Sequence, residues 1–215
     1  MMPAQTAEQR QLERELSDGL NALDQNFAPG TNEKLLHYVS LISKWNRVHN
    51  LTAIRDPARM ISHHILDSLA IIPFIVGPRL LDVGTGAGLP GIPVAIACPG
   101  FAVTLIDSSS KKFAFLQQAT ADLVLGNVQS VCARVEQWTG GPFETIVSRA
   151  YSELKQFVSS AQHLLSDGGV LAAMKGALPA SEIDELPPGF RVRGIERLAV
   201  PGLDAERHLI LIEKS

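Results

Sequence analysis

The chain has 215 residues, a formal net charge of −3 and 46% hydrophobic residues. Such a length and composition exclude a disordered chain and suit one α/β fold with an extension. No apolar run is long enough to span a membrane, and the first residues lack a secretion signal, so we expect a cytoplasmic protein without membrane contact. Cys98 and Cys132 have no metal-ligand spacing, so we expect reduced thiols and no bound metal.

Residues 1–75 are expected to form a helical extension. Residues 5–26 carry leucines at helical spacing, and a break at 28–30 precedes a second helical stripe with Thr31 as its expected N-cap. Asp56 and Pro57 are expected to start a third helix. We place a domain boundary after residue 75, so that residues 76–215 form a second domain.

Strands and helices alternate in this second domain. Apolar runs predict strands at 80–83, 101–106, 128–131, 143–147 and 170–174, with helices near 92–97, 108–125 and 153–164. A turn is expected at 167–169, and two more strands, near 191–198 and 208–213, are expected to close the chain as an antiparallel hairpin. The alternation predicts an α/β fold, a Rossmann-like and mostly parallel seven-stranded sheet with helices on both faces and an antiparallel C-terminal strand.

A glycine-rich segment organises the second domain. A short apolar run leads into Asp82 and then into Gly84, Gly86 and Gly88, before Pro90 begins a helix. Glycines let the backbone bend sharply and let a ligand approach the main chain. The order of strand, glycine loop and helix is typical of nucleotide-binding sheets. A glycine turn without a ligand is the structural alternative.

The type of cofactor depends on Asp82. Gly86, Gly88 and Gly91 also fit the dinucleotide pattern, and Asp107, 21 residues after Gly86, lies where an acid holds a ribose. An acid beside a diphosphate is unfavourable, whereas an acid beside the cationic methionine part of S-adenosylmethionine is favourable. The pattern D-x-G-x-G-x-G therefore favours S-adenosylmethionine, and a dinucleotide-dependent oxidoreductase is the alternative.

The carboxyl ends of the predicted strands are expected to meet at one edge of the sheet, where open α/β sheets bind ligands. Asp107 can accept hydrogen bonds from both ribose hydroxyls there, or cap the following helix. The turn at 134–136 can hold adenine through main-chain N–H groups, and a plain loop fits it equally well. Arg149 follows the fourth strand, where a cation is costly unless it is paired or faces a ligand.

Charge is distributed unevenly along the chain. Residues 1–33 contain two basic and six acidic residues. The basic window, residues 34–64, contains five basic residues, one acidic residue and four of the six histidines. A local basic face suits contacts with phosphates, and an ordinary solvated helix face is the alternative.

Absent motifs narrow the reaction. The fourth strand leads into Ser148, Arg149 and Ala150 rather than into the Asp/Asn-Pro-Pro-aromatic motif of amine methylation. Cys98 precedes a proline, whereas the thiol of a pyrimidine-methylating enzyme usually follows one. A reaction without a base or a nucleophile fits best, such as methylation of guanine N7, which already has a lone pair. Catalysis would then rest mainly on alignment and proximity.

Five segments together resemble the ribosomal RNA small-subunit methyltransferase G family, also called glucose-inhibited division protein B. They are Trp45–Thr52, His63–Ser68, Asp82–Gly91, Asp107–Lys112 and Ser148–Ala150. The resemblance implies a class I S-adenosylmethionine-dependent methyltransferase that modifies N7 of one guanine in 16S rRNA of the small ribosomal subunit. We expect it to act as a monomer. An arginine is commoner in the family than His63 at that position.

The resemblance also suggests roles for single residues: Gly84, Leu89, Val135, Glu136 and Arg149 would line the cofactor site. With the residues argued above, the expected cofactor-binding set is Asp82, Gly84, Gly86, Gly88, Leu89, Asp107, Val135, Glu136 and Arg149, and Arg149 is also the expected catalytic residue. The expected RNA-binding residues are Arg47, Asn50, Arg55, His63, His64 and Lys111. His64 and Asp67 either order this RNA-contacting region or form a buried structural pair. A nucleic-acid-binding module of the same fold without activity is the third functional class.

Overall fold

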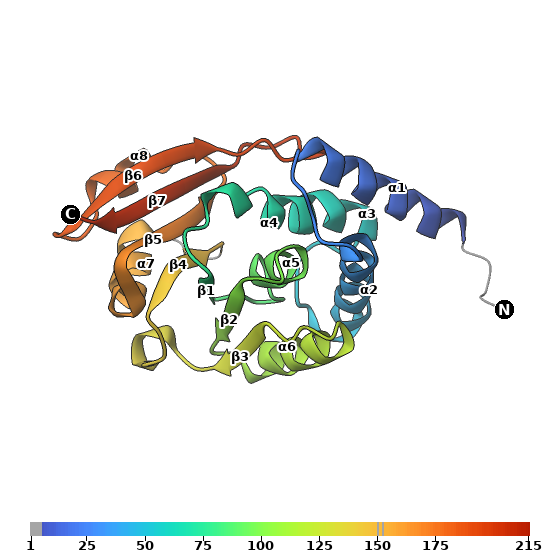
Figure 1. The fold of residues 1–215 in the computed structure, drawn as a ribbon, viewed down its shortest axis with the longest axis horizontal. Coiled ribbons are helices and arrows are strands. Elements are labelled where there is room, and N and C mark those ends of the chain that lie inside the picture. Colours follow the sequence, from blue (N-terminus) through green and yellow to red (C-terminus); the bar gives the residue numbers. More distant parts are fainter. Residues whose placement is uncertain (1–5, 150, 152) are drawn as a thin grey trace.

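The computed structural model describes residues 6–149, 151 and 153–215. Its strands are β1 (Arg79–Val83), β2 (Ala102–Asp107), β3 (Val128–Cys132), β4 (Phe143–Ser148), β5 (Leu165–Lys175), β6 (Phe190–Arg197) and β7 (His208–Lys214). They form one seven-stranded sheet in the order β3-β2-β1-β4-β5-β7-β6 (Figure 1). Strands β1 to β5 are parallel, and β7 is antiparallel to both of its neighbours. The predicted mostly parallel sheet and C-terminal antiparallel hairpin are confirmed.

Short and long helices connect these strands and precede them. They are α1 (Ala7–Ala22), α2 (Thr31–His49), α3 (Pro57–Met60), the π-helical turn η1 (Ile61–Leu66), α4 (Asp67–Leu69), η2 (Ile72–Phe74), α5 (Gly91–Ala97), α6 (Ser110–Asp122), η3 (Val135–Gln137), α7 (Leu154–Ala161), η4 (Gln162–Leu164) and α8 (Ala180–Asp184). Local chemistry explains several of the helix starts. The Thr6 side chain caps α1 in a capping box with Gln9, and Asp56 caps α3, in which Pro57 is the first residue.

Two hydrophobic clusters cover the two faces of the sheet. Successive residues of a strand point to opposite faces, so Leu80 belongs to one cluster and Leu81 to the other. The helices of the extension share the first cluster with α5 and α6, and α7 contributes to the second. Figure 1 shows α2 and α4 beside α5, and α6 beside α2, with α7 across the sheet. The extension is thus packed on the sheet by a shared core, and the domain boundary after residue 75 stays a prediction.

Three local predictions differ from the structure. Thr31 is the first helical residue of α2, because Gly30 occupies the N-cap with a φ of +81° that disfavours a side chain. The helix α5 begins at Gly91, with Pro90 at its N-cap. The expected turn at 167–169 lies inside β5. Phe143 of β4 pairs with Leu165, and Thr145 pairs with Val170, so the extra residues of β5 between these two pairs form a bulge.

The sheet order places the site. Strand β1 lies between β2 and β4, so the direction of winding reverses there, and this reversal opens a crevice at the carboxyl ends of the strands. The Ser148 hydroxyl, at the end of β4, donates to the Val83 carbonyl at the end of β1, with 2.8 Å between the oxygens. The glycine loop and Arg149 therefore leave the sheet from adjacent strands.

Candidate functional site

The glycine loop between β1 and α5 combines an open side with a packed side. Gly84, Gly86 and Gly88 have φ values of +66°, +62° and +89°. A Cβ at Gly84 would meet no atom within 4 Å, and a Cβ at Gly86 would meet only the Gly84 carbonyl at 3.9 Å, whereas a Cβ at Gly88 would lie 2.4 Å from Ile92. The first two glycines thus leave space beside the main chain that a ligand can fill, and the third lets α5 pack against the loop.

Asp82 lies beneath this loop and is fully buried. Its Oδ2 accepts hydrogen bonds from the Thr85 hydroxyl at 2.6 Å and the Gly91 amide at 2.8 Å. Its Oδ1 is buried without a hydrogen-bond partner in the described part of the chain. Burial raises the pKa of Asp82 to about 6, against the lowering effects of these two hydrogen bonds and of Arg149. A buried carboxylate oxygen without a donor fits a cationic ligand group, as the ammonium of S-adenosylmethionine would provide.

Asp107 joins the loop to the next helix. Its Oδ2 accepts from the Gly86 amide at 3.0 Å and lies 3.3 Å from Lys112 Nζ, and its Oδ1 accepts from the Ser109 amide at 2.9 Å. The N-cap of α6 is Ser109, so the alternative reading of Asp107 as the helix cap is wrong. Asp107 instead holds the glycine loop at the end of β2, and its contact with a ribose stays a prediction.

A cavity of about 470 Å³ lies at these strand ends. Four of the predicted cofactor-binding residues line it, namely Gly84, Asp107, Val135 and Glu136. The structure also adds Ser108, Lys112 and Tyr151, which the sequence analysis did not single out for the cofactor. Residues from β1, β2, η3 and the segment after β4 thus form one pocket, as expected for a sheet with this topology.

The remaining predicted cofactor residues lie around the pocket without lining it. Gly88 and Leu89 are buried, and the Leu89 side chain belongs to the core, so its side chain is not available to a ligand. Arg149 faces the extension, where its Nη1 donates to the His63 carbonyl at 3.1 Å and to Asp67 Oδ2 at 3.3 Å. The direct contact of Arg149 with the cofactor stays a prediction.

His64 is not available to RNA, and the prediction that it contacts RNA is wrong. The residue is only 4% exposed, and its Nε2 lies 2.8 Å from the Thr52 hydroxyl. Burial, with the nearby Arg149, lowers the pKa of His64 to about 4, so the imidazole is neutral at pH 7. No hydrogen bond joins His64 to Asp67 among the described residues; His64 instead anchors the segment after α2, whose Thr52 amide donates to the Asn46 side chain.

The other predicted RNA-binding residues are accessible. Arg47, Asn50, Arg55 and Lys111 are exposed, and His63 is half-buried. Trp45 of α2 packs edge-on against Phe115 of α6, with 5.5 Å between the ring centroids, so the ends of these two helices lie together. Arg47 and Lys111 therefore lie on neighbouring helices, and their contact with RNA stays a prediction.

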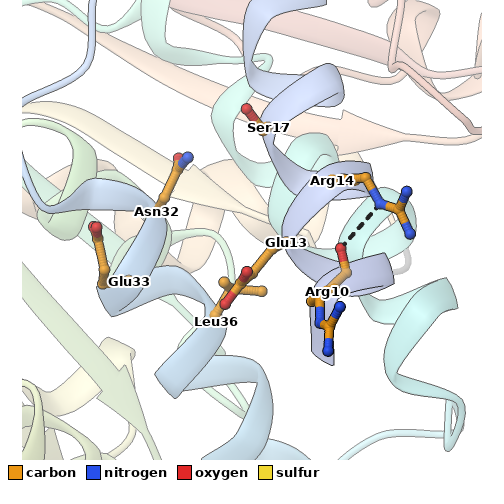
Figure 2. A pocket seen from close by; sticks show the side chains of 7 residues that line it. All are labelled: Arg10, Glu13, Arg14, Ser17, Asn32, Glu33 and Leu36. Atoms are coloured by element: carbon orange, nitrogen blue, oxygen red, sulfur yellow. Dashed lines mark hydrogen bonds between the residues drawn. The ribbon is translucent and has the colours of Figure 1, made fainter. Parts of the chain in front are cut away.

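A second hollow, of about 760 Å³, lies between α1 and α2. Figure 2 shows Glu13 of α1 reaching toward Leu36 of α2, with Arg14 pointing away from α2. Its charges are mixed, and none of its lining residues belongs to a strand end. This hollow therefore does not match the predicted cofactor site.

A family model described as rRNA small subunit methyltransferase G matches residues 31–210. The chain belongs to this family. The ribosomal RNA small subunit methyltransferase G of Laribacter hongkongensis is 50% identical over 200 residues, which cover 93% of this chain and 97% of that protein. The protein of the same name from Burkholderia thailandensis is 49% identical over 219 residues, which cover 98% and 95%. The methyltransferase interpretation is thereby confirmed over the oxidoreductase and the inactive module.

Solved methyltransferase structures share the fold. The glycopeptide N-methyltransferase MtfA, complexed with S-adenosyl-L-homocysteine, matches with a TM-score of 0.59 at 14% identity over 71% of this chain and 87% of that chain. TrmN from Thermus thermophilus matches with a TM-score of 0.56 at 23% identity, over 69% and 48%. At such low identity these likenesses show the fold alone, and they confirm the predicted Rossmann-like methyltransferase fold.

Part of the support for the glycine loop comes from the extension, which was not predicted from the sequence. The hydroxyl of Tyr38, a fully buried residue of α2, donates to the Ala87 carbonyl in the glycine loop. The only signal in the sequence was a hydroxyl-bearing residue within an apolar helical stripe.

Among the described helices, none is both long and apolar enough to cross a membrane.

Proposed function

We propose that this chain transfers a methyl group from S-adenosylmethionine to N7 of one guanine in 16S rRNA of the small ribosomal subunit. Membership of the rRNA small subunit methyltransferase G family is the observation that carries this proposal. The pocket at the strand ends, with Gly84 and Asp107 in its wall and the unpartnered Asp82 oxygen beneath the loop, supports the same cofactor.

The chemistry needs few groups from the protein. S-adenosylmethionine supplies a methyl group bound to a positively charged sulfur, and the leaving group is the neutral thioether. The guanine N7 lone pair forms the new N–C bond, the S–C bond breaks, and its electron pair remains on sulfur. No proton is removed, because N7 carries none and the product base bears the positive charge. The protein therefore contributes mainly by aligning N7 with the methyl group.

Named residues divide this work. Asp107 would bind the ribose hydroxyls, Asp82 would attract the ammonium group, and the main chain at 135–136 would hold the adenine. Arg149, at the end of β4, would bind and orient the target guanine through N–H groups that its contacts with the protein do not use. Arg47, Asn50, Arg55, His63 and Lys111 would bind phosphates around the target loop, which fixes the register of the RNA. We further propose that the enzyme works as a monomer in the cytoplasm.

A methyl-transfer assay tests the proposal. Small ribosomal subunits that lack the modification are incubated with the protein and S-adenosylmethionine labelled on its methyl group. We expect label in 16S rRNA with the wild-type chain and none with Gly86→Val, because a branched side chain at a φ of +62° is strained and enters the open side of the loop. The matched control is Gly100→Ala, since a Cβ there meets nothing within 4 Å. Loss of activity in the control, or label with Gly86→Val, would contradict the assigned site.

A further inference from the structure

A buried carboxylate connects Arg149 to a second arginine. Asp67, in α4, has a side chain that is 2% exposed. Its Oδ2 lies 3.3 Å from Arg149 Nη1, and its Oδ1 lies 3.0 Å from Arg207 Nε. Arg149 follows β4, and Arg207 immediately precedes β7. The cluster thus joins the extension, the site and the C-terminal hairpin.

Arg149 is held through a single nitrogen. Its Nη1 donates to both Asp67 Oδ2 and the His63 carbonyl. Within the described residues, no hydrogen bond from Nε or Nη2 is formed. A guanidinium beside a free carboxylate frequently forms two parallel N–H···O hydrogen bonds. Such a pair uses two of the guanidinium nitrogens. Here Arg207 Nε binds Oδ1 and so fixes the orientation of the carboxylate, in which Arg149 is hydrogen-bonded through Nη1 to Oδ2 alone.

Arg207 is itself well placed to keep this arrangement. Its Nη1 donates to the Glu206 carbonyl at 2.8 Å, and its side chain is only 24% exposed. Burial raises the pKa of Asp67, and Arg149 and Arg207 counteract that effect. Water has little access to Asp67, so loss of Arg207 leaves Asp67 Oδ1 buried without a donor. We expect Arg149, the remaining arginine, to move and donate a second hydrogen bond to the carboxylate.

We propose that Arg207 is a positioning residue for methyl transfer, which acts through Asp67 to hold Arg149 by one nitrogen and leave its other N–H groups for the guanine. The inference rests on the proposed role of Arg149 in the reaction. It concerns how the site is held together, and it assigns a function to a residue of the C-terminal hairpin that lies outside the pocket.

The test compares kcat and KM for methyl transfer to small subunits in Arg207→Gln, Arg207→Lys and Arg149→Gln and in the double variant Arg207→Gln/Arg149→Gln. We expect Arg207→Gln to lower kcat about 10- to 100-fold, as small misplacements of aligned groups do. Its dissociation constant for S-adenosylmethionine should stay within about threefold of wild type, because Arg207 does not line the pocket. Arg207→Lys should restore most of kcat, since an ammonium can also occupy Oδ1. The double variant should be no slower than Arg149→Gln alone.

Two further variants keep the result interpretable. Arg79→Gln removes an arginine from a similar pair, with Glu144 at 2.8 Å, at the opposite end of β1, and should leave kcat unchanged. Asp67→Asn gives an independent route if Arg207→Gln does not fold. It keeps the side-chain shape but removes the negative charge and one of the two acceptor oxygens, and it should also lower kcat only while Arg149 is present.

Multiplying losses in the double variant would show that Arg207 acts independently of Arg149, and would overturn the inference. Failure of Arg207→Lys to restore activity would overturn it as well. A fully active Arg149→Gln would remove the role assigned to Arg149 and this inference together, while methyl transfer by the wild-type chain would still uphold the proposed function.

Discussion

At the scale of single residues, Asp107 both supports the glycine loop and lines the predicted cofactor pocket. Its carboxylate accepts from the amides of Gly86 and Ser109, which shapes the loop, and it lines the pocket where a ribose would bind. Both tasks use the same two oxygens, each of which has more than one lone pair. The residue is therefore part of the loop's structure and a candidate ligand contact.

Replacement of Asp107 by alanine should weaken S-adenosylmethionine binding. The expected loss is about 1.5–3 kcal/mol, the range for hydrogen bonds to a charged group. Calorimetric titration measures it, with Asp122→Ala as the control, because Asp122 is exposed at the end of α6. An equal dissociation constant for wild type and Asp107→Ala would reduce Asp107 to a support of the loop.

His64 should make stability depend on pH. Its pKa is lowered to about 4 in the folded state, against about 6.5 for an exposed histidine, so the unfolded chain binds a proton first as the pH falls. The stabilisation is present above pH 6.5 and is lost as the pH falls toward 4, at a rate of at most about 1.4 kcal/mol per pH unit. Asp82, whose pKa is raised to about 6, acts in the opposite sense over an overlapping range.

Denaturant unfolding from pH 4.5 to 7.5 isolates the histidine. We expect His64→Gln to show a smaller rise of the unfolding free energy with pH than wild type, because the contribution of Asp82 is common to both proteins. His37→Gln is the matched control, since His37 is exposed on α2. Parallel curves for wild type and His64→Gln would mean that the imidazole is not kept neutral by the fold.

At the scale of elements, α2 supports the glycine loop directly. Tyr38→Phe removes only the hydroxyl that donates to the Ala87 carbonyl, and leaves that buried carbonyl without this donor. We expect the free energy of unfolding to fall by about 1–3 kcal/mol and cofactor affinity to fall with it. Thermal unfolding with and without S-adenosylmethionine measures both effects. A variant that loses stability but binds the cofactor as tightly as wild type would separate α2 from the site.

Helices and strands were predictable where a local sequence pattern determines the backbone conformation. The strand, glycine loop and helix around Gly84 follow from backbone freedom, and the final hairpin follows from two apolar runs with little helix between them. The π-helical turn η1 and the bulge in β5 were not predictable, because packing against other segments decides them.

The site shows the same division. The pocket residues Asp107 and Val135 lie at strand ends, which the order of elements locates. The burial of His64 and the pairing of Asp67 with Arg207 depend on contacts between residues as far apart as 140 positions, and no local pattern reports them.

At the scale of the whole molecule, a protein with a net negative charge carries a basic window in its helical extension. The exposed arginines Arg47 and Arg55 lie at the end of α2 and in the segment after it. Phosphate contacts set the affinity for RNA and make binding fall as salt rises. Replacing both arginines by glutamine should lower affinity for small subunits and reduce the steepness of its salt dependence, with cofactor affinity unchanged.

Binding at several salt concentrations checks this prediction. The control is Arg191→Gln/Arg193→Gln, which removes the same charge from the edge strand β6. A flatter salt dependence in the control than in Arg47→Gln/Arg55→Gln would place the RNA on the hairpin instead of the extension.

Methylation at N7 of one guanine in 16S rRNA is the reaction that we propose for this chain. Mapping of N7-methylguanosine by chemical strand cleavage, on small-subunit RNA treated with the protein and S-adenosylmethionine, tests it most directly. We expect one new cleavage site in 16S rRNA, which is absent without the cofactor and absent with Gly86→Val. Methyl transfer to another atom or to many guanines, or no transfer at all, would contradict it.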